Sequence, residues 1–122
     1  MAWLVRDGEV LATAEIASTR AARRRGLLGR DGADGAVVLR PCRQVHTFGM
    51  RFPIDVVWCG SGGRVLRTAS LRRSRVSRPV LRARFVIEAD AGAVGRWDLH
   101  AGDVIEIVDG ASGDGDAGSR DA

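Results

Sequence analysis

The sequence contains no lysine, asparagine or tyrosine, and none of its 122 residues belongs to a long hydrophobic run. A membrane-spanning helix needs about 20 consecutive apolar residues, so the sequence predicts no helical membrane span. The first residues also lack the apolar stretch and cleavage site of a secretory signal peptide. We therefore expect a cytoplasmic protein that does not insert into a membrane.

Cysteine and histidine are scarce as well. The two cysteines, Cys42 and Cys59, do not form a Cys-x-x-Cys pair, and His46 and His100 are the only histidines. A structural zinc site normally takes four such ligands at short spacings, and disulfides are rare in reducing compartments. The sequence therefore predicts no metal site and no cofactor, with both thiols free and at least half-buried.

Arginine supplies all 19 basic residues, although the formal net charge is only +4. A GC-rich genome accounts for this preference, but residues 64–84 hold eight arginines and no acidic residue. A field of one sign can attract phosphates or acidic polymers, and the candidate anion-binding residues are Arg64, Arg67, Arg72, Arg73 and Arg75. Single-strand binders stack bases on aromatic rings. Because only Phe85 lies near this segment, a solvated strand face is favoured over a nucleic-acid site.

Turn signals divide the chain into short strands. Asp7-Gly8 suits a tight type I′ turn between strands at 3–6 and 9–16. Ser18 or Thr19 can cap a helix over residues 20–28 that ends at Gly29, while Gly26 within it indicates a close backbone crossing or an early helix end. The other expected elements are strands at 36–39, 54–59, 64–71, 85–88 and 103–108, and a helical turn at 91–97.

This pattern predicts a mainly β fold, a small sandwich or barrel-like domain of the jelly-roll kind with one or two short helices. Strands and helices do not alternate regularly, so a doubly wound parallel sheet is not expected. The composition changes after Val108 to Gly, Asp, Ser and Ala without a large apolar residue. Such a segment buries too little surface to offset its ordering entropy. We expect one folded domain at 1–108 and a disordered tail at 109–122.

The central block Gln44-Val45-His46-Thr47-Phe48-Gly49-Met50-Arg51-Phe52-Pro53-Ile54-Asp55-Val56-Val57-Trp58 resembles the signature of the domain of unknown function 192 family. Three flanking motifs match in the same order, at residues 26–30 (Gly-Leu-Leu-Gly-Arg), 86–92 (Val-Ile-Glu-Ala-Asp-Ala-Gly) and 102–103 (Gly-Asp). The resemblance covers about residues 9–108. It implies a compact β-sandwich-like domain with a short helix or two, and it brings no established reaction, substrate or cofactor. Cys59-Gly60 departs from the pattern, where members often continue the strand.

Five residues are the candidate ligand-binding set. A histidine, a hydroxyl and two carboxylates can bind a polar ligand, and histidine titrates near neutrality. Pro53 interrupts the block, so spacing alone does not show that its polar groups meet, and each group also has a structural interpretation. A carboxylate within an apolar strand has to be paired or hydrogen-bonded when buried. The set consists of His46, Thr47, Met50, Asp55 and Glu88.

Three functions remain open at the level of sequence. The first is a small non-catalytic binding or accessory module, whose polar cleft takes a small ligand or a partner protein segment. The second is a hydrolase-like enzyme with His46 as base, oriented by Asp55 or Glu88. The third is an anion or nucleic-acid binder that uses residues 64–84. No complete catalytic constellation is present, so we expect the first.

Overall fold

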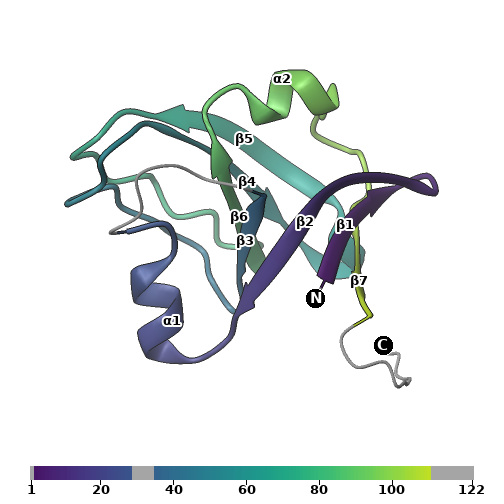
Figure 1. Ribbon diagram of the computed structural model, residues 1–122, viewed down its shortest axis with the longest axis horizontal. Coiled ribbons are helices and arrows are strands. Elements are labelled where there is room, and N and C mark those ends of the chain that lie inside the picture. Colours follow the sequence, from purple (N-terminus) through teal and green to yellow (C-terminus); the bar gives the residue numbers. More distant parts are fainter. Residues whose placement is uncertain (1, 29–34, 111–122) are drawn as a thin grey trace.

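Seven strands and two short helices make up the computed structural model, which describes residues 2–28 and 35–110. The strands form one mixed sheet in the order β5-β4-β6-β3-β2-β1-β7 (Figure 1). The elements are β1 (Ala2–Arg6), β2 (Glu9–Ala17), α1 (Arg20–Arg25), β3 (Ala36–Leu39), β4 (Ile54–Cys59), the 3-10 turn η1 (Ser61–Gly63), β5 (Val65–Leu71), β6 (Phe85–Asp90), α2 (Ala93–Trp97) and β7 (Glu106–Asp109).

The first hairpin forms as the sequence predicts. Asp7 and Gly8 have φ angles of 52° and 79°, the two positive values that a type I′ turn needs. β1 and β2 pair as antiparallel strands on either side of this turn. β1 also pairs with β7, so the last strand of the sheet lies beside the first.

Helix α1 connects two parallel strands. Thr19 caps it, because its hydroxyl oxygen accepts a hydrogen bond from the Ala22 amide at 3.0 Å. The helix then ends at Arg25, and Gly26 follows with φ 45°. The predicted end at Gly29 is therefore wrong, and the alternative of an early end at Gly26 is confirmed. β2 and β3 pair in parallel, which the sequence pattern did not indicate.

Both faces of the sheet are buried at its central strands, whereas β2 and β7 keep several exposed residues. The central strands β3 and β4 consist entirely of buried residues, which explains why they are continuous apolar runs rather than alternating patterns. On one face the core includes Leu4, Val38 and Ile87 and continues into α2. On the other face it includes Trp58 and Leu27 and continues into the segments around α1. Figure 1 shows the two helices on different sides of the sheet.

The mainly β prediction is confirmed as a single seven-stranded mixed sheet with two short helices. A two-sheet sandwich or jelly roll is not shown. The start of β5 also bonds to the segment before β7, since the Val65 amide donates to the Asp103 carbonyl at 2.7 Å. No helix in the described ranges is long and apolar enough to cross a membrane. Most of the predicted tail at 109–122 lies outside the described residues. The same is true of most of the turn that precedes β3.

Candidate functional site

Glu88 is a buried carboxylate in the middle of β6. It stands between Val56 of β4 and Val37 of β3, on the apolar face that also carries Trp58. The residue is only 5% exposed. Its Oε1 accepts a hydrogen bond from the Leu27 amide at 3.2 Å, whereas Oε2 has no hydrogen-bond partner within the described part of the chain.

This environment changes the acidity of Glu88. Burial disfavours the ionised form and raises the pKa of the carboxyl from 4.5 to about 7, although the hydrogen bond from Leu27 acts in the opposite direction. A group with this pKa exchanges its proton near neutrality, so it can either accept or donate a hydrogen bond to a ligand.

Gly26 permits the close approach of the α1 end to this carboxyl. A Cβ atom at position 26 would lie 2.5 Å from Glu88 Oε1, which is closer than a real contact allows. The positive φ angle of Gly26 adds a second reason for glycine at this position. The group that approaches Gly26 is the side chain of Glu88 and not a crossing backbone, so of the two alternatives predicted for Gly26 the early helix end is the one confirmed.

A cavity of about 260 Å³ opens beside Glu88, and we call it the Glu88 pocket. Helix α1 contributes four arginines to its lining, while Cys42, Gln44 and His46 come from the segment after β3. Cys42 Sγ donates to the Gln44 carbonyl at 3.3 Å, and burial is the main reason why the pKa of this thiol is raised. The pocket thus combines a buried carboxyl group with four positively charged residues in its lining, Arg20, Arg23, Arg24 and Arg25.

His46 is exposed at the pocket lining, and its ring stacks on Phe48 with the centroids 5.6 Å apart. Within the described ranges, no carboxylate hydrogen-bonds to this ring. Met50 is buried and also lines the pocket. The structure therefore brings His46, Met50 and Glu88 together.

Thr47 does not face the Glu88 pocket and instead bonds to the neighbouring loop at residues 72–75. Its hydroxyl donates to the Arg72 carbonyl at 2.6 Å and accepts from the Arg75 amide at 2.7 Å. The Thr47 amide donates to the Arg75 carbonyl, and the Ser74 amide donates to the Thr47 carbonyl. Thr47 is fully buried and does not line the Glu88 pocket, so its contacts are those of a loop anchor.

Asp55 lies on the opposite face of the sheet from Glu88. Strand alternation decides this, because Glu88 pairs with Val56, the residue that follows Asp55 in β4. Asp55 Oδ1 accepts from the Ser70 hydroxyl at 2.7 Å, and Oδ2 accepts from the Gly92 and Val94 amides at 3.1 and 3.0 Å. Asp55 therefore fixes the start of α2, and the sheet separates it from the Glu88 pocket.

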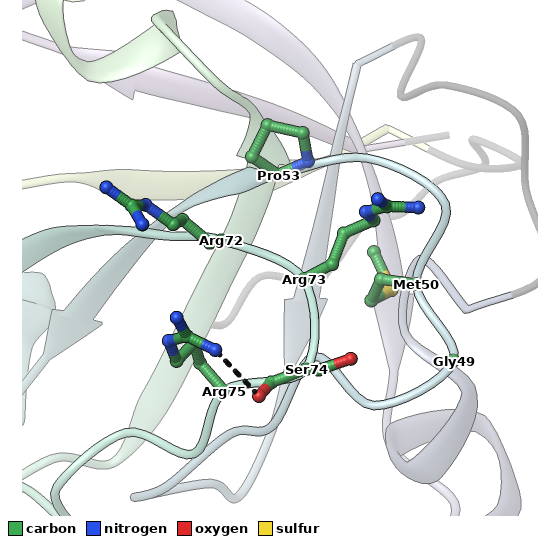
Figure 2. A pocket seen from close by; sticks show the side chains of 7 residues that line it. All are labelled: Gly49, Met50, Pro53, Arg72, Arg73, Ser74 and Arg75. Atoms are coloured by element: carbon green, nitrogen blue, oxygen red, sulfur yellow. Dashed lines mark hydrogen bonds between the residues drawn. The ribbon is translucent and has the colours of Figure 1, made fainter.

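The candidate anion-binding arginines divide into two groups. Arg72, Arg73 and Arg75 line a second cavity of about 550 Å³ together with Gly49, Met50, Pro53 and Ser74, which we call the Arg72 pocket (Figure 2). Arg67 instead places its guanidinium 5.6 Å from the centre of the Trp58 ring. Arg64 forms a backbone bridge with Val104 near the start of β5. The five candidates thus do not form one site.

The family model for domain of unknown function 192, described as "Uncharacterized ACR", matches residues 2–107. The chain belongs to this family. Two curated relatives are UPF0127 proteins of Thermococcus gammatolerans, 34% identical over 97 residues, and of Thermococcus kodakarensis, 29% identical over 97 residues. Each alignment covers 75% of this chain, and it spans 63% and 62% of the relatives' length.

A crystal structure of a protein of unknown function from Novosphingobium aromaticivorans has the same fold as this family member. It aligns with a TM-score of 0.71 at 19% identity, over 86% of this chain and 82% of that chain. The family resemblance read from the central signature is thus confirmed. The comparisons assign no reaction or ligand to this chain.

Sequence reasoning missed most of the wall of the Glu88 pocket in this DUF192 protein. The arginines of α1 look like an ordinary solvent-facing helix surface, Cys42 belongs to no motif, and Gln44 begins the central block without standing out as a candidate. Gly26 gave the available signal, as a glycine in the middle of an expected helix. Among the described residues, no group of three or more His, Cys, Asp or Glu side chains is placed to hold a metal ion.

Proposed function

We propose that this protein is a small binding module whose Glu88 pocket takes a small polar ligand. The observation that carries the proposal is the free Oε2 atom of a carboxyl group that is 5% exposed and lines a cavity. Buried polar groups are nearly always hydrogen-bonded, and an exception calls for an explanation. A ligand that donates a hydrogen bond to Oε2 supplies one.

The charges of the lining indicate the chemistry of this ligand. The guanidinium groups of α1 favour an anionic group such as a carboxylate or phosphate. Glu88 favours a hydroxyl, amide or amino group at the other end of the ligand. A cavity of about 260 Å³ suits a molecule the size of an amino acid or a monosaccharide, or the end of a partner segment.

The alternative function, a hydrolase with His46 as base, needs a carboxylate to orient the histidine. Of the two candidates, Asp55 and Glu88, only one remains. Asp55 is on the other face of the sheet, so only Glu88 shares the pocket with His46. A general base has to be held by its orienting group within hydrogen-bond reach. Over the residues the structure describes, no hydrogen bond joins these two side chains. The geometry accordingly favours binding over catalysis.

A thermal-shift screen of amino acids, monosaccharides and nucleotides at pH 8 tests the proposal. We expect at least one compound to raise the melting temperature of the wild type. Its effect should disappear in Glu88→Gln, which retains an oxygen acceptor for the Leu27 amide. The effect should also weaken in His46→Ala.

The matched control is Glu106→Gln, the same substitution at an exposed position of β7. This variant should retain the full shift, because Glu106 does not line the pocket. A screen in which no compound stabilises the wild type would count against the proposal. A shift that survives in Glu88→Gln would place the binding elsewhere and reject this site.

A further inference from the structure

The Arg72 pocket is a cavity outside the site proposed above. Its floor and one wall come from the loop around Gly49, Met50 and Pro53, and three arginines of one four-residue segment complete it. Figure 2 shows Arg72 and Arg75 extending to the same side of this segment, while Arg73 reaches towards Met50. Of the described residues that line the two pockets, Met50 is the only one they share.

The segment that carries these arginines is held in a fixed conformation. The buried hydroxyl of Thr47 bonds to the Arg72 carbonyl and to the carbonyl and amide of Arg75, and the Thr47 backbone bonds to the Arg75 carbonyl and the Ser74 amide. Ser74 has a φ angle of 61°, an uncommon value for a residue other than glycine. Because the backbone of this loop is fixed before a ligand binds, less conformational entropy is lost on binding.

The charge of the pocket is not neutralised internally. In the described part of the chain, no carboxylate forms an ion pair with Arg72, Arg73 or Arg75. Arg75 donates to the neighbouring Ser74 carbonyl at 3.3 Å, and this leaves its other guanidinium donors available. Guanidinium groups match oxyanions of phosphate type, because several N–H donors in one plane can engage two oxygens at once.

The positions of Arg64 and Arg67 argue for a small anion rather than a polymer. Arg67 stacks over Trp58, and Arg64 directly precedes β5, eight residues before Arg72, which is roughly 26 Å at the rise of a strand. No continuous stripe therefore links these side chains to the Arg72 pocket. A nucleic-acid strand needs such a stripe and stacking rings along it.

We propose that the Arg72 pocket is a second ligand site, which binds a small phosphate-type oxyanion through Arg72 and Arg75, the two arginines that extend to the same side of the segment. The anion is inorganic phosphate or the phosphate group of a small phosphorylated compound. The site is independent of the Glu88 pocket and of whatever ligand that pocket takes.

Titration of inorganic phosphate and of pyrophosphate at about 0.15 M ionic strength, where distant charges are screened, followed by amide NMR shifts, tests this site. We expect saturable shifts at residues 49, 50 and 72–75, and tighter binding of pyrophosphate because it carries more charge. The double variant Arg72→Gln/Arg75→Gln should weaken the affinity at least about tenfold, the equivalent of one charge-assisted hydrogen bond.

Two double variants with the same change of charge serve as controls. Arg64→Gln/Arg67→Gln removes two candidate arginines outside both pockets, and Arg23→Gln/Arg24→Gln removes two from the Glu88 pocket. Both should bind phosphate within about twofold of the wild type, since screened long-range charge contributes little. Equal weakening in all three variants would show general attraction by net charge and overturn the proposal.

Two further results would also overturn it. If only Arg23→Gln/Arg24→Gln loses affinity, the anion occupies the Glu88 pocket. If phosphate causes no saturable shift while a short single-stranded oligonucleotide binds, the arginines serve a polymer instead. A negative result at the Arg72 pocket would not count against the proposed function of the Glu88 pocket, because the thermal-shift screen tests variants of other residues.

Discussion

Two buried carboxylates lie on neighbouring strands of the same sheet and have opposite surroundings. Asp55 of β4 is 3% exposed and Glu88 of β6 is 5% exposed, so solvent reaches them about equally little. Asp55 accepts three hydrogen bonds, from Ser70, Gly92 and Val94. Glu88 accepts one, from Leu27, and lines a cavity.

The difference separates a structural role from a candidate binding role. A buried carboxylate whose oxygens are fully hydrogen-bonded stabilises the elements that supply the donors, here α2 and β5. A buried carboxylate with a free oxygen lowers the stability of the fold and persists where a ligand uses it. By this criterion Asp55 belongs to the framework and Glu88 to the site.

The largest expected effect is that of Asp55→Ala. The substitution leaves a hydroxyl and two amides without their acceptor in a buried region, and each lost bond of this kind costs about 1 to 1.5 kcal/mol. We expect the free energy of unfolding to fall by about 4 kcal/mol in urea denaturation. Ser70→Ala removes only one of the three donors and should cost about 1 kcal/mol. Equal effects of the two variants would contradict the role of Asp55 as a shared acceptor.

Glu88→Gln should do the opposite and stabilise the protein at high pH. The folded pKa of about 7 exceeds the ordinary value of 4.5, so the folded state holds a proton that the unfolded state has lost between these pH values. The wild type therefore loses stability as the pH rises from 4.5 to 7, by up to about 3 kcal/mol. Glutamine does not titrate, so the variant should not share this loss.

Urea denaturation of both proteins at several pH values measures this difference. The stability of Glu88→Gln relative to the wild type should increase between pH 4.5 and 7 and stay constant above pH 7. The contributions of other titrating groups cancel in the comparison. A difference that does not change with pH would mean that Glu88 ionises freely, and the contrast with Asp55 would then break down.

Local signals in the sequence predict most of the secondary structure. The Asp7-Gly8 turn, the Thr19 cap and the apolar runs of β3 and β4 depend on residues close together in the chain, and each is found where the pattern indicates. The parallel pairing of β2 with β3 and the single sheet depend on contacts between distant segments. Periodicity does not determine which strands become neighbours, so the sandwich prediction went beyond what the pattern supports.

The candidate site was predicted in part for the same reason. His46, Met50 and Glu88 stand out as polar or unusual residues within apolar surroundings, and they do share a cavity. Which face of the sheet a side chain occupies depends on strand register, and this separates Asp55 from them. The arginines of α1 line the same pocket, and the helix ends early at a glycine that packs on Glu88.

Gly26→Ala tests that last contact and should have the smallest of the three effects. The new Cβ would meet Glu88 Oε1 at 2.5 Å and would also strain a backbone with φ 45°. We expect a loss of about 2 kcal/mol in urea denaturation, together with loss of any ligand that Glu88 holds, because the carboxyl has to move.

Gly95→Ala is the matched control, since nothing lies within 4 Å of a Cβ there and α2 is helical at that position. It should leave ligand binding intact and stabilise the protein by about 0.5 kcal/mol. If Gly26→Ala proves as harmless as Gly95→Ala, the end of α1 does not press on the carboxyl, and the free oxygen of Glu88 would need another explanation.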